Sequence, residues 1–311
     1  MPDQPGRIIL FGSGETSASG RKIYDWLLSQ TAQPIQVAVL ETPAGFEPNS
    51  AQVAGQVADF LRQRLQNYHP QVTIIPARKR GTAFSPDDPT IVAPLRQANV
   101  IFLGPGSPTY TVRQLSDSLA WRTLLDQHGR GAALILASAA TLAASACTLP
   151  VYEIYKVGED LHWRQGLDLF GLYGLSLVFV PHWNNTDGGT ALDTSRCYMG
   201  QTRFEQLLAL LPADSTVIGL DEHTALVLDL AGGDCQVMGR SGVTLLKAGI
   251  EQRFLAGQTF ALTELGPYRL PSDFLPALSV VTDTPAPPAQ MDATAGSVGP
   301  AGTASGRPRS T

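Results

Sequence analysis

Ser138 occupies the position that a nucleophilic serine needs in a parallel α/β protein. An apolar run at residues 133–137 leads directly into Ser138, Ala139, Ala140 and Thr141, and a stretch that permits a helix follows. A sharp strand-to-helix turn would raise the hydroxyl above the sheet and aim backbone N–H groups at the same spot. Small neighbours suit such a crowded turn, although alanine fits less freely than glycine. The competing interpretation is a serine that only N-caps a buried helix.

A glycine-rich loop supplies the second element of acyl transfer, a place where negative charge can be stabilised. Residues 104–108, GPGSP, follow the apolar run at residues 100–103. A glycine lets the backbone approach a substrate closely, so the N–H of Gly106 could donate to a developing oxyanion together with the N–H of Ala139. The loop therefore predicts an oxyanion hole beside Ser138, with an ordinary strand-to-helix turn as the alternative.

His182 is the best-placed base for this serine, because serine at its ordinary pKa is a poor nucleophile. It follows the apolar run at residues 175–180 within the polar cluster PHWNN, at the end of a predicted strand. The remaining histidines are His69, His128, His162 and His223. Two of these follow predicted helices at the opposite end of the sheet and one lies in a middle loop. His223 is the competitor, because it ends another strand.

A carboxylate must hold the imidazole in the correct tautomer, and Glu153 is the residue that we favour. It lies fifteen residues after Ser138 in VYEIY, a segment rich in strand-forming residues. A carboxylate with such apolar neighbours is either exposed at an edge or buried with a partner, and we expect the partner. The alternative acids are Glu15, Glu41, Asp187 and Asp221.

These residues need a framework, which the alternation of short apolar runs with helical stretches predicts. We expect an α/β fold of three layers, in which helices cover both faces of a mostly parallel sheet. The expected strands of the first half are residues 7–11, 35–40, 72–76, 100–103 and 133–137. The expected helices are residues 20–29, 50–67, 91–97, 109–118 and 121–128. Ligands bind beyond the carboxyl ends of such strands, which is where Ser138 stands.

The second half of the chain is expected to complete the same sheet. Strands at residues 175–180 and 217–220 flank a helix near residues 204–211. Antiparallel strands at one edge are predicted where glycines separate apolar runs, at residues 225–230, 236–238 and 243–246. Residues 1–270 would then form one domain. Residues 271–311, rich in Pro, Ala, Gly, Ser and Thr, are expected to form a disordered tail.

Composition argues against several other classes of protein. The net charge of −5 disfavours nucleic-acid binding, because nucleic-acid binders concentrate basic residues on one face. No apolar run approaches the ~20 residues that span a bilayer, and no signal-peptide pattern is present, so we expect a cytoplasmic protein without membrane contact. The three cysteines lack C-x-x-C spacing, and we expect neither a metal nor another cofactor. The sequence leaves a homodimer open.

Four stretches resemble the peptidase family that contains dipeptidase E and cyanophycinase. They are GPGSPTY with the following TVRQL, ILASAAT, FVPHWNN and IGLDEHTALVLD, and the resemblance covers roughly residues 8–247. The family consists of serine hydrolases on the class I glutamine-amidotransferase-like fold, so the resemblance implies that fold here. It also implies that Ser138 is the nucleophile, His182 the base and Glu153 the acid, with the two oxyanion donors chosen above.

The sequence departs from the family pattern at the site itself. SAAT stands where the family has SAGA, and GPG stands where it has GGG. Methyl groups in the turn could narrow the site or change the substrate, and the proline removes one possible donor. Residues 152–163 also lack an obvious equivalent in the characterised peptidases. These departures predict a distinct subgroup.

The expected reaction is attack on an amide or peptide bond near a chain end, in a small peptide or amide substrate. Arg196 and Arg203 could clamp a substrate carboxylate. Alternatively, Glu15, Glu41 and Asp187 would favour a positively charged end. The other expected substrate contacts are Tyr110, Asn184 and Asn185.

Other functions fit the sequence less well. The rival is a catalytically silent relative that binds a peptide or small metabolite, which the alanine-rich turn supports. A glutaminase partner of a synthetase would need cysteine in place of Ser138. The N-terminal FGSGETSASG has neither dinucleotide-binding spacing nor a P-loop lysine.

Overall fold

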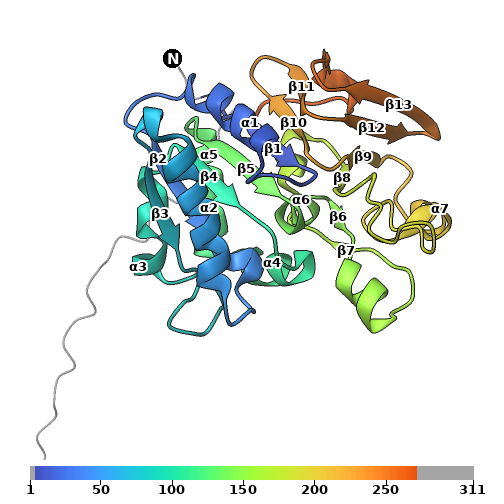
Figure 1. Ribbon diagram of the computed structural model, residues 1–311, viewed down its shortest axis with the longest axis horizontal. Coiled ribbons are helices and arrows are strands. Elements are labelled where there is room, and N and C mark those ends of the chain that lie inside the picture. Colours follow the sequence, from blue (N-terminus) through green and yellow to red (C-terminus); the bar gives the residue numbers. More distant parts are fainter. Residues whose placement is uncertain (1–3, 272–311) are drawn as a thin grey trace, which may run out of the picture. The chain divides into compact units, whose positions relative to one another are not determined.

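Five short apolar segments form the parallel part of an eight-stranded sheet in the computed structural model, which describes residues 4–271 (Figure 1). In the order of the sheet they are β1 (Ile8–Phe11), β5 (Ala133–Ala137), β4 (Val100–Leu103), β2 (Gln36–Leu40) and β3 (Gln71–Ile75). Strands β1, β4 and β5 are buried on both faces, which explains their continuous apolar sequences. The predicted α/β class and the mainly parallel sheet are confirmed.

Three antiparallel strands extend the sheet beyond β1. Strand β10 (Thr224–Asp229) pairs with β1, β11 (Asp234–Gly239) pairs with β10, and β14 (Thr259–Ala261) closes this side. The antiparallel edge predicted for the C-terminal part of the sequence is therefore present. Strands β10 and β11 cover two of the three strands expected there, whereas the third, at residues 243–246, belongs to a second sheet.

Helices cover both faces of the sheet. Helices α1 (Ala18–Leu28) and α2 (Ser50–Arg64) pack their apolar sides on one face, and both lie in front of the sheet in Figure 1. Helices α3 (Pro89–Val92), α4 (Pro108–Leu115) and α5 (Leu119–Gly129) supply apolar residues to the core of the other face. The short α6 (Ala139–Ala143) follows β5 directly.

A second sheet corrects the prediction that all strands belong to one. It contains β13 (Ile250–Leu255), β12 (Gly242–Lys247), β9 (Thr216–Leu220) and β8 (Leu177–Val180) in that order. In the chain, helix α7 (Gly200–Leu208) lies between β8 and β9. Leu142 of α6 packs among Val178 and Val180 of β8, so α6 lies where the two sheets meet. Apolar runs predict strands, but they do not specify which strand pairs with which.

The segment between α6 and β8 differs from the prediction as well. It carries the two-stranded pair β6 (Cys147–Thr148) and β7 (Arg164–Gln165), separated by a π-helical turn at Glu153–Val157. The strand-forming residues at 151–155 therefore lie partly in a helical turn, because packing overrides their local preference for a strand. None of the described helices is long and apolar enough to cross a membrane. The predicted tail begins at Pro271 and otherwise lies outside the described residues.

A buried histidine makes stability depend on pH. His128 is fully buried, with Nε2 2.7 Å from the Tyr173 hydroxyl and Nδ1 3.3 Å from the Ala132 carbonyl oxygen. Burial disfavours the charged ring and lowers the pKa of His128 to about 4, below the ordinary 6.5. The unfolded chain therefore takes up a proton first as the pH falls, and stability is lost between about pH 6.5 and pH 4.

We expect the free energy of unfolding to drop by about 2 kcal/mol between pH 7 and pH 5 through this residue. Urea unfolding of the wild type and of His128→Gln at both pH values measures the effect. The variant should be less stable at pH 7 but should show a smaller drop. An equal drop in both proteins would assign the pH dependence to other groups.

Candidate active site

Ser138 lies on a strained turn between β5 and α6. Its backbone angles are φ 51° and ψ −109°, a conformation that is costly for a residue with a side chain. Buried Thr141 holds the turn, because its hydroxyl lies 2.9 Å from the Leu136 carbonyl oxygen and 3.1 Å from that of Phe11. The turn therefore bridges β5 and the neighbouring β1. It leaves the Ser138 side chain partly exposed above the carboxyl ends of the strands.

His182 contacts this serine although the two residues come from different sheets. Nε2 of His182 lies 3.0 Å from Oγ of Ser138. The backbone N–H of His182 donates to the carbonyl oxygen of Gly12, just beyond β1, at 3.2 Å, and this bond ties the end of β8 to the central sheet. His182 also has a positive φ of 53°. Ser138 and His182, which the sequence predicted to interact, are therefore brought together by a contact between the two sheets that the sequence did not reveal.

The carboxylate beside His182 belongs to Glu222, which corrects the choice of Glu153. Oε1 of Glu222 lies 3.0 Å from Nδ1 of His182. Glu222 stands in the short connection from β9 to β10, where the chain crosses from one sheet to the other. Glu153 lies in the π-helical turn, and its carboxylate accepts a hydrogen bond from the Thr109 hydroxyl at 2.5 Å.

Two asparagines that we expected to bind substrate hold Glu222 instead. The side-chain amide of Asn185 donates to Oε1 of Glu222 at 3.0 Å, and the backbone N–H of Glu222 donates to Oδ1 of Asn184 at 2.8 Å. Asn185 is buried. Glu222 is therefore held in place through both its carboxylate and its backbone.

These hydrogen bonds define the protonation state of the imidazole. They lower the pKa of Glu222 to about 2, with the His182 bond as the largest cause and the Asn185 bond as a further one, against an opposing effect of burial. An ionised carboxylate only accepts hydrogen bonds, so Nδ1 of His182 carries the proton. Nε2 is then left with its lone pair facing the hydroxyl of Ser138, which is the tautomer that a general base needs.

The Asn185 contact leads to a prediction. Asn185→Ala removes a donor from the carboxylate of Glu222 and leaves the contact with His182 less well oriented. We expect kcat on an activated ester to fall by about 10-fold, with little change in KM. Steady-state kinetics test this, and Asn49→Ala, at the start of α2, is the control. A rise in KM with kcat unchanged would instead assign Asn185 to substrate binding.

The glycine-rich loop that was predicted to form an oxyanion hole, called the oxyanion loop below, lies between β4 and α4. Gly106 has a φ of 149°, and a Cβ added there would lie 1.9 Å from the carbonyl oxygen of Pro43. Only glycine fits this position. Among the described residues, the backbone N–H groups of Gly106 and Ala139 have no hydrogen-bond acceptor.

Both arginines that were expected to clamp a substrate carboxylate contact the protein itself. The guanidinium of Arg196 stacks over the ring of Trp183 at 4.0 Å, and that of Arg203 donates to the carbonyl oxygens of Met199 and Tyr198 at 2.7 Å each. Both groups are occupied by the protein itself. They brace the segment after His182, in which residues 196–198 all have positive φ.

The remaining candidates are dispersed around the site. The Tyr110 hydroxyl donates to the carbonyl oxygen of Arg78, and Asp187 accepts from the Tyr198 hydroxyl at 2.9 Å. Glu15 lines a surface pocket of about 450 Å³ that also touches Pro105 of the oxyanion loop. The alternative base, His223, is exposed, and its backbone N–H donates to Ser13.

Two of the alternative acids have structural partners. Glu41 forms an ion pair with Arg78 at 2.5 Å. Asp221 is buried and pairs with Arg253, while also accepting from Ser241 at 2.5 Å. Asp221 and His223 were both considered, and Glu222 between them was not. Its position two residues after the end of a predicted strand was the available signal.

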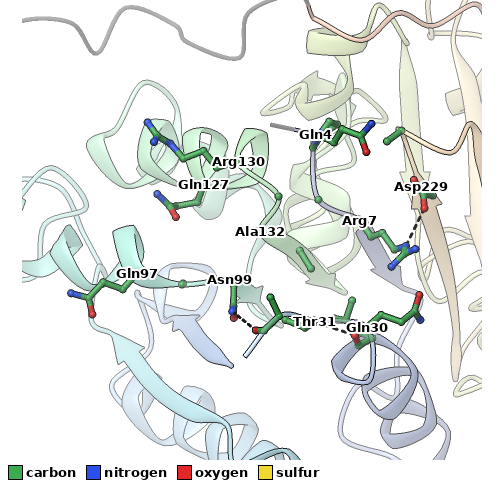
Figure 2. A pocket seen from close by; sticks show the side chains of 18 residues that line it. Gln4, Arg7, Gln30, Thr31, Gln97, Asn99, Gln127, Arg130, Ala132 and Asp229 are labelled. Carbon is green, nitrogen blue, oxygen red and sulfur yellow. Dashed lines mark hydrogen bonds and ion pairs between the residues drawn. The ribbon is translucent and has the colours of Figure 1, made fainter. Parts of the chain in front are cut away.

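A larger pocket lies at the other end of the central sheet. Its volume is about 540 Å³, and it is lined by the residues that precede β1 and β5 and by the ends of α1 and α5 (Figure 2). Some of its polar groups bond to each other, including an ion pair between Arg7 and Asp229 at 3.1 Å. The Asn99 amide donates to two backbone carbonyls. This pocket is remote from Ser138, because it opens at the amino ends of the parallel strands.

Two solved structures share the fold. One is a peptidase from an acI-B1 Actinobacterium, with a TM-score of 0.66 and 23% identity, and the match covers 84% of this chain and 98% of that chain. The other is a provisionally assigned Peptidase E protein from Listeria monocytogenes EGD-e, with a TM-score of 0.50 and 16% identity, covering 76% and 100% of the two chains. No protein-family model and no curated protein matches this sequence. At these identities the similarity establishes the fold.

Proposed function

We propose that this chain is a serine hydrolase that cleaves an amide or peptide bond through an acyl-serine intermediate. The observation that carries the proposal is the continuous chain of contacts from Ser138 Oγ to His182 Nε2 and from His182 Nδ1 to Glu222, each 3.0 Å long. Nucleophile, base and orienting acid follow one another at hydrogen-bond distance, as acyl transfer requires.

The first half of the reaction forms the acyl-enzyme. Ser138 Oγ attacks the substrate carbonyl carbon while its proton moves to Nε2 of His182, and the carbonyl oxygen takes up the negative charge. The carbon–nitrogen bond then breaks as the imidazolium returns that proton to the leaving amine. Glu222 stays ionised throughout and stabilises the charged ring.

The second half repeats the steps with water. His182 takes a proton from a water molecule that attacks the acyl carbon, and the proton passes to Ser138 Oγ as the ester bond breaks. The products are a carboxylic acid and the free enzyme. In both halves the backbone N–H groups of Gly106 and Ala139 are the proposed donors to the oxyanion.

The substrate is proposed to be a small peptide or amide cleaved near a chain end. The names of the two solved neighbours, a peptidase and a Peptidase E, support this class of substrate. Glu15 and Asp187 remain available to attract a positively charged end, since the structure gives neither of them an ion-pair partner among the described residues. A carboxylate clamp is not part of the proposal, because Arg196 and Arg203 are engaged elsewhere.

Labelling with an alkyl fluorophosphonate tests the function without a known substrate. In the wild type, Ser138 Oγ should attack the phosphorus of the probe and displace its fluoride, and the resulting phosphonyl ester should map to the peptide that contains Ser138. Ser138→Ala should not be labelled, whereas Ser29→Ala, an exposed serine at the end of α1, should be labelled like the wild type. A folded wild-type protein that resists labelling would favour the silent binder.

A further inference from the structure

We propose that Glu153 is a positioning residue that holds the oxyanion loop, an inference that rests on the proposed function. Its Oε1 accepts a hydrogen bond from the Thr109 hydroxyl at 2.5 Å. Thr109 lies in the first turn of α4, three residues after Gly106. A carboxylate from the segment after Ser138 is therefore bonded to the loop that faces the nucleophile.

The hydrogen bond continues from Thr109 into the loop. Oγ1 of Thr109 lies 3.1 Å from Oγ of Ser107, and Ser107 Oγ accepts from the backbone N–H of Tyr110 at 3.2 Å. Ser107 thus caps α4 and is bonded to the Glu153–Thr109 pair at the same time. Because Ser107 directly follows Gly106, its position determines how the Gly106 peptide is oriented.

The loop needs such support because a glycine does not fix its own backbone conformation. Gly106 has a φ of 149°, and it packs against the carbonyl group of Pro43 without room for a side chain. The backbone N–H of Ser107 donates to Pro43 at 2.9 Å, and the Thr111 hydroxyl donates to the Ser107 carbonyl at 2.7 Å. These bonds fix one side of the loop. Glu153 fixes the side that faces α6, against which α4 packs (Figure 1).

The state of the Glu153 carboxylate argues for a functional role. Its Oε2 is buried and has no hydrogen-bond partner, and the group forms no ion pair with any described cation. A buried oxygen without a partner costs stability, and unsatisfied groups of this kind concentrate at functional sites.

The test measures how fast the same fluorophosphonate labels Ser138 in a set of variants. Its phosphoryl oxygen must enter the oxyanion hole as the phosphorus–serine bond forms. Glu153→Ala and Thr109→Val both remove the hydrogen bond between Glu153 and Thr109. Each should lower the maximal labelling rate by about 10-fold, without weakening the initial binding of the probe. The double variant should lose no more than either single one, because both remove the same hydrogen bond.

Conservative variants separate the hydrogen bond from charge and from folding. Thr109→Ser and Glu153→Gln keep a donor and an acceptor, and they should label within about 3-fold of the wild type. Glu159→Gln, an exposed carboxylate in the same segment, is the matched control. Thermal melting identifies any variant whose slow labelling comes from unfolding.

The outcomes separate the inference from the proposed function. A wild type that labels, together with Glu153→Ala and Thr109→Val that label equally fast, overturns the role of Glu153 and leaves the function intact. Glu153→Gln as slow as Glu153→Ala also overturns it, because the acceptor is then not what matters. A wild type that does not label at all rejects the proposed function itself.

Discussion

Glu222→Gln is expected to lower kcat by about 10³- to 10⁴-fold, the effect of losing the acid that orients a catalytic imidazole. Glutamine keeps the shape of the side chain but can present an N–H to Nδ1 of His182. The ring then holds its proton on Nε2, where it cannot accept the hydrogen of Ser138. The carboxamide also fails to stabilise the imidazolium that forms during attack.

The decisive comparison is with Glu153→Gln, which makes the same chemical change at the other candidate acid. It should stay within about 3-fold of the wild type, because its contact is with Thr109 rather than with His182. Steady-state kinetics on an activated ester give both values. If Glu153→Gln lost the larger share of activity, the assignment of Glu222 would be wrong.

The pH dependence follows from the same contact. Since the pKa of Glu222 is about 2, its carboxylate is ionised at every pH above about 4. Loss of activity on mild acidification should therefore not come from protonation of Glu222. Any acid limb in the kcat profile of the wild type above about pH 4 should persist in the residual activity of Glu222→Gln, and its disappearance from that variant would contradict the low pKa of Glu222.

Ser138→Ala is expected to have the largest effect of any single substitution, a loss of about 10⁶-fold in kcat. The structure explains why alanine should still fold. Ser138 is partly exposed, and the turn is held by Thr141 rather than by the Ser138 hydroxyl. Stability should change by less than about 1 kcal/mol, since a methyl group replaces a hydroxymethyl at a partly exposed position.

The control for this prediction is Thr141→Val, which removes a buried hydroxyl from the same turn. It should lower the melting temperature, because two carbonyl oxygens lose their donor. Ser138→Ala should keep the wild-type melting temperature. Activity retained by a folded Ser138→Ala protein would mean that the hydroxyl is not the nucleophile.

Sequence reasoning located Ser138, His182 and Gly106 because each follows a strand at its carboxyl end. That rule depends only on chain direction in a parallel sheet, which apolar runs and intervening helices predict well. The prediction did not require the pairing of strands to be known.

Glu222 was missed for a reason that is specific to this fold. Its position next to His182 depends on β8 and β9 pairing in a separate sheet, and on the chain crossing to β10 at residues 221–223. Strand partners of this kind are set by packing over long sequence separations, which periodicity does not encode. Glu153 was chosen instead because it follows Ser138 closely and stands among apolar residues.

The asparagines and arginines after β8 were misjudged for a related reason. Polar residues near a site were expected to face a substrate, but Asn184, Asn185, Arg196 and Arg203 all bond to neighbouring groups of the protein. Consecutive positive φ angles at residues 196–198 explain the need for these bonds, because a strained backbone must be held in place. Composition alone does not reveal such strain.

Mass spectrometry of an acid-quenched reaction tests the central claim most directly. The enzyme is mixed with an excess of an activated acyl ester, quenched within the first turnovers and digested. We predict one acyl group per chain, on the peptide that contains Ser138, and none in Ser138→Ala. Turnover that proceeds without any acyl group on Ser138, or with the acyl group on another residue, would contradict the account.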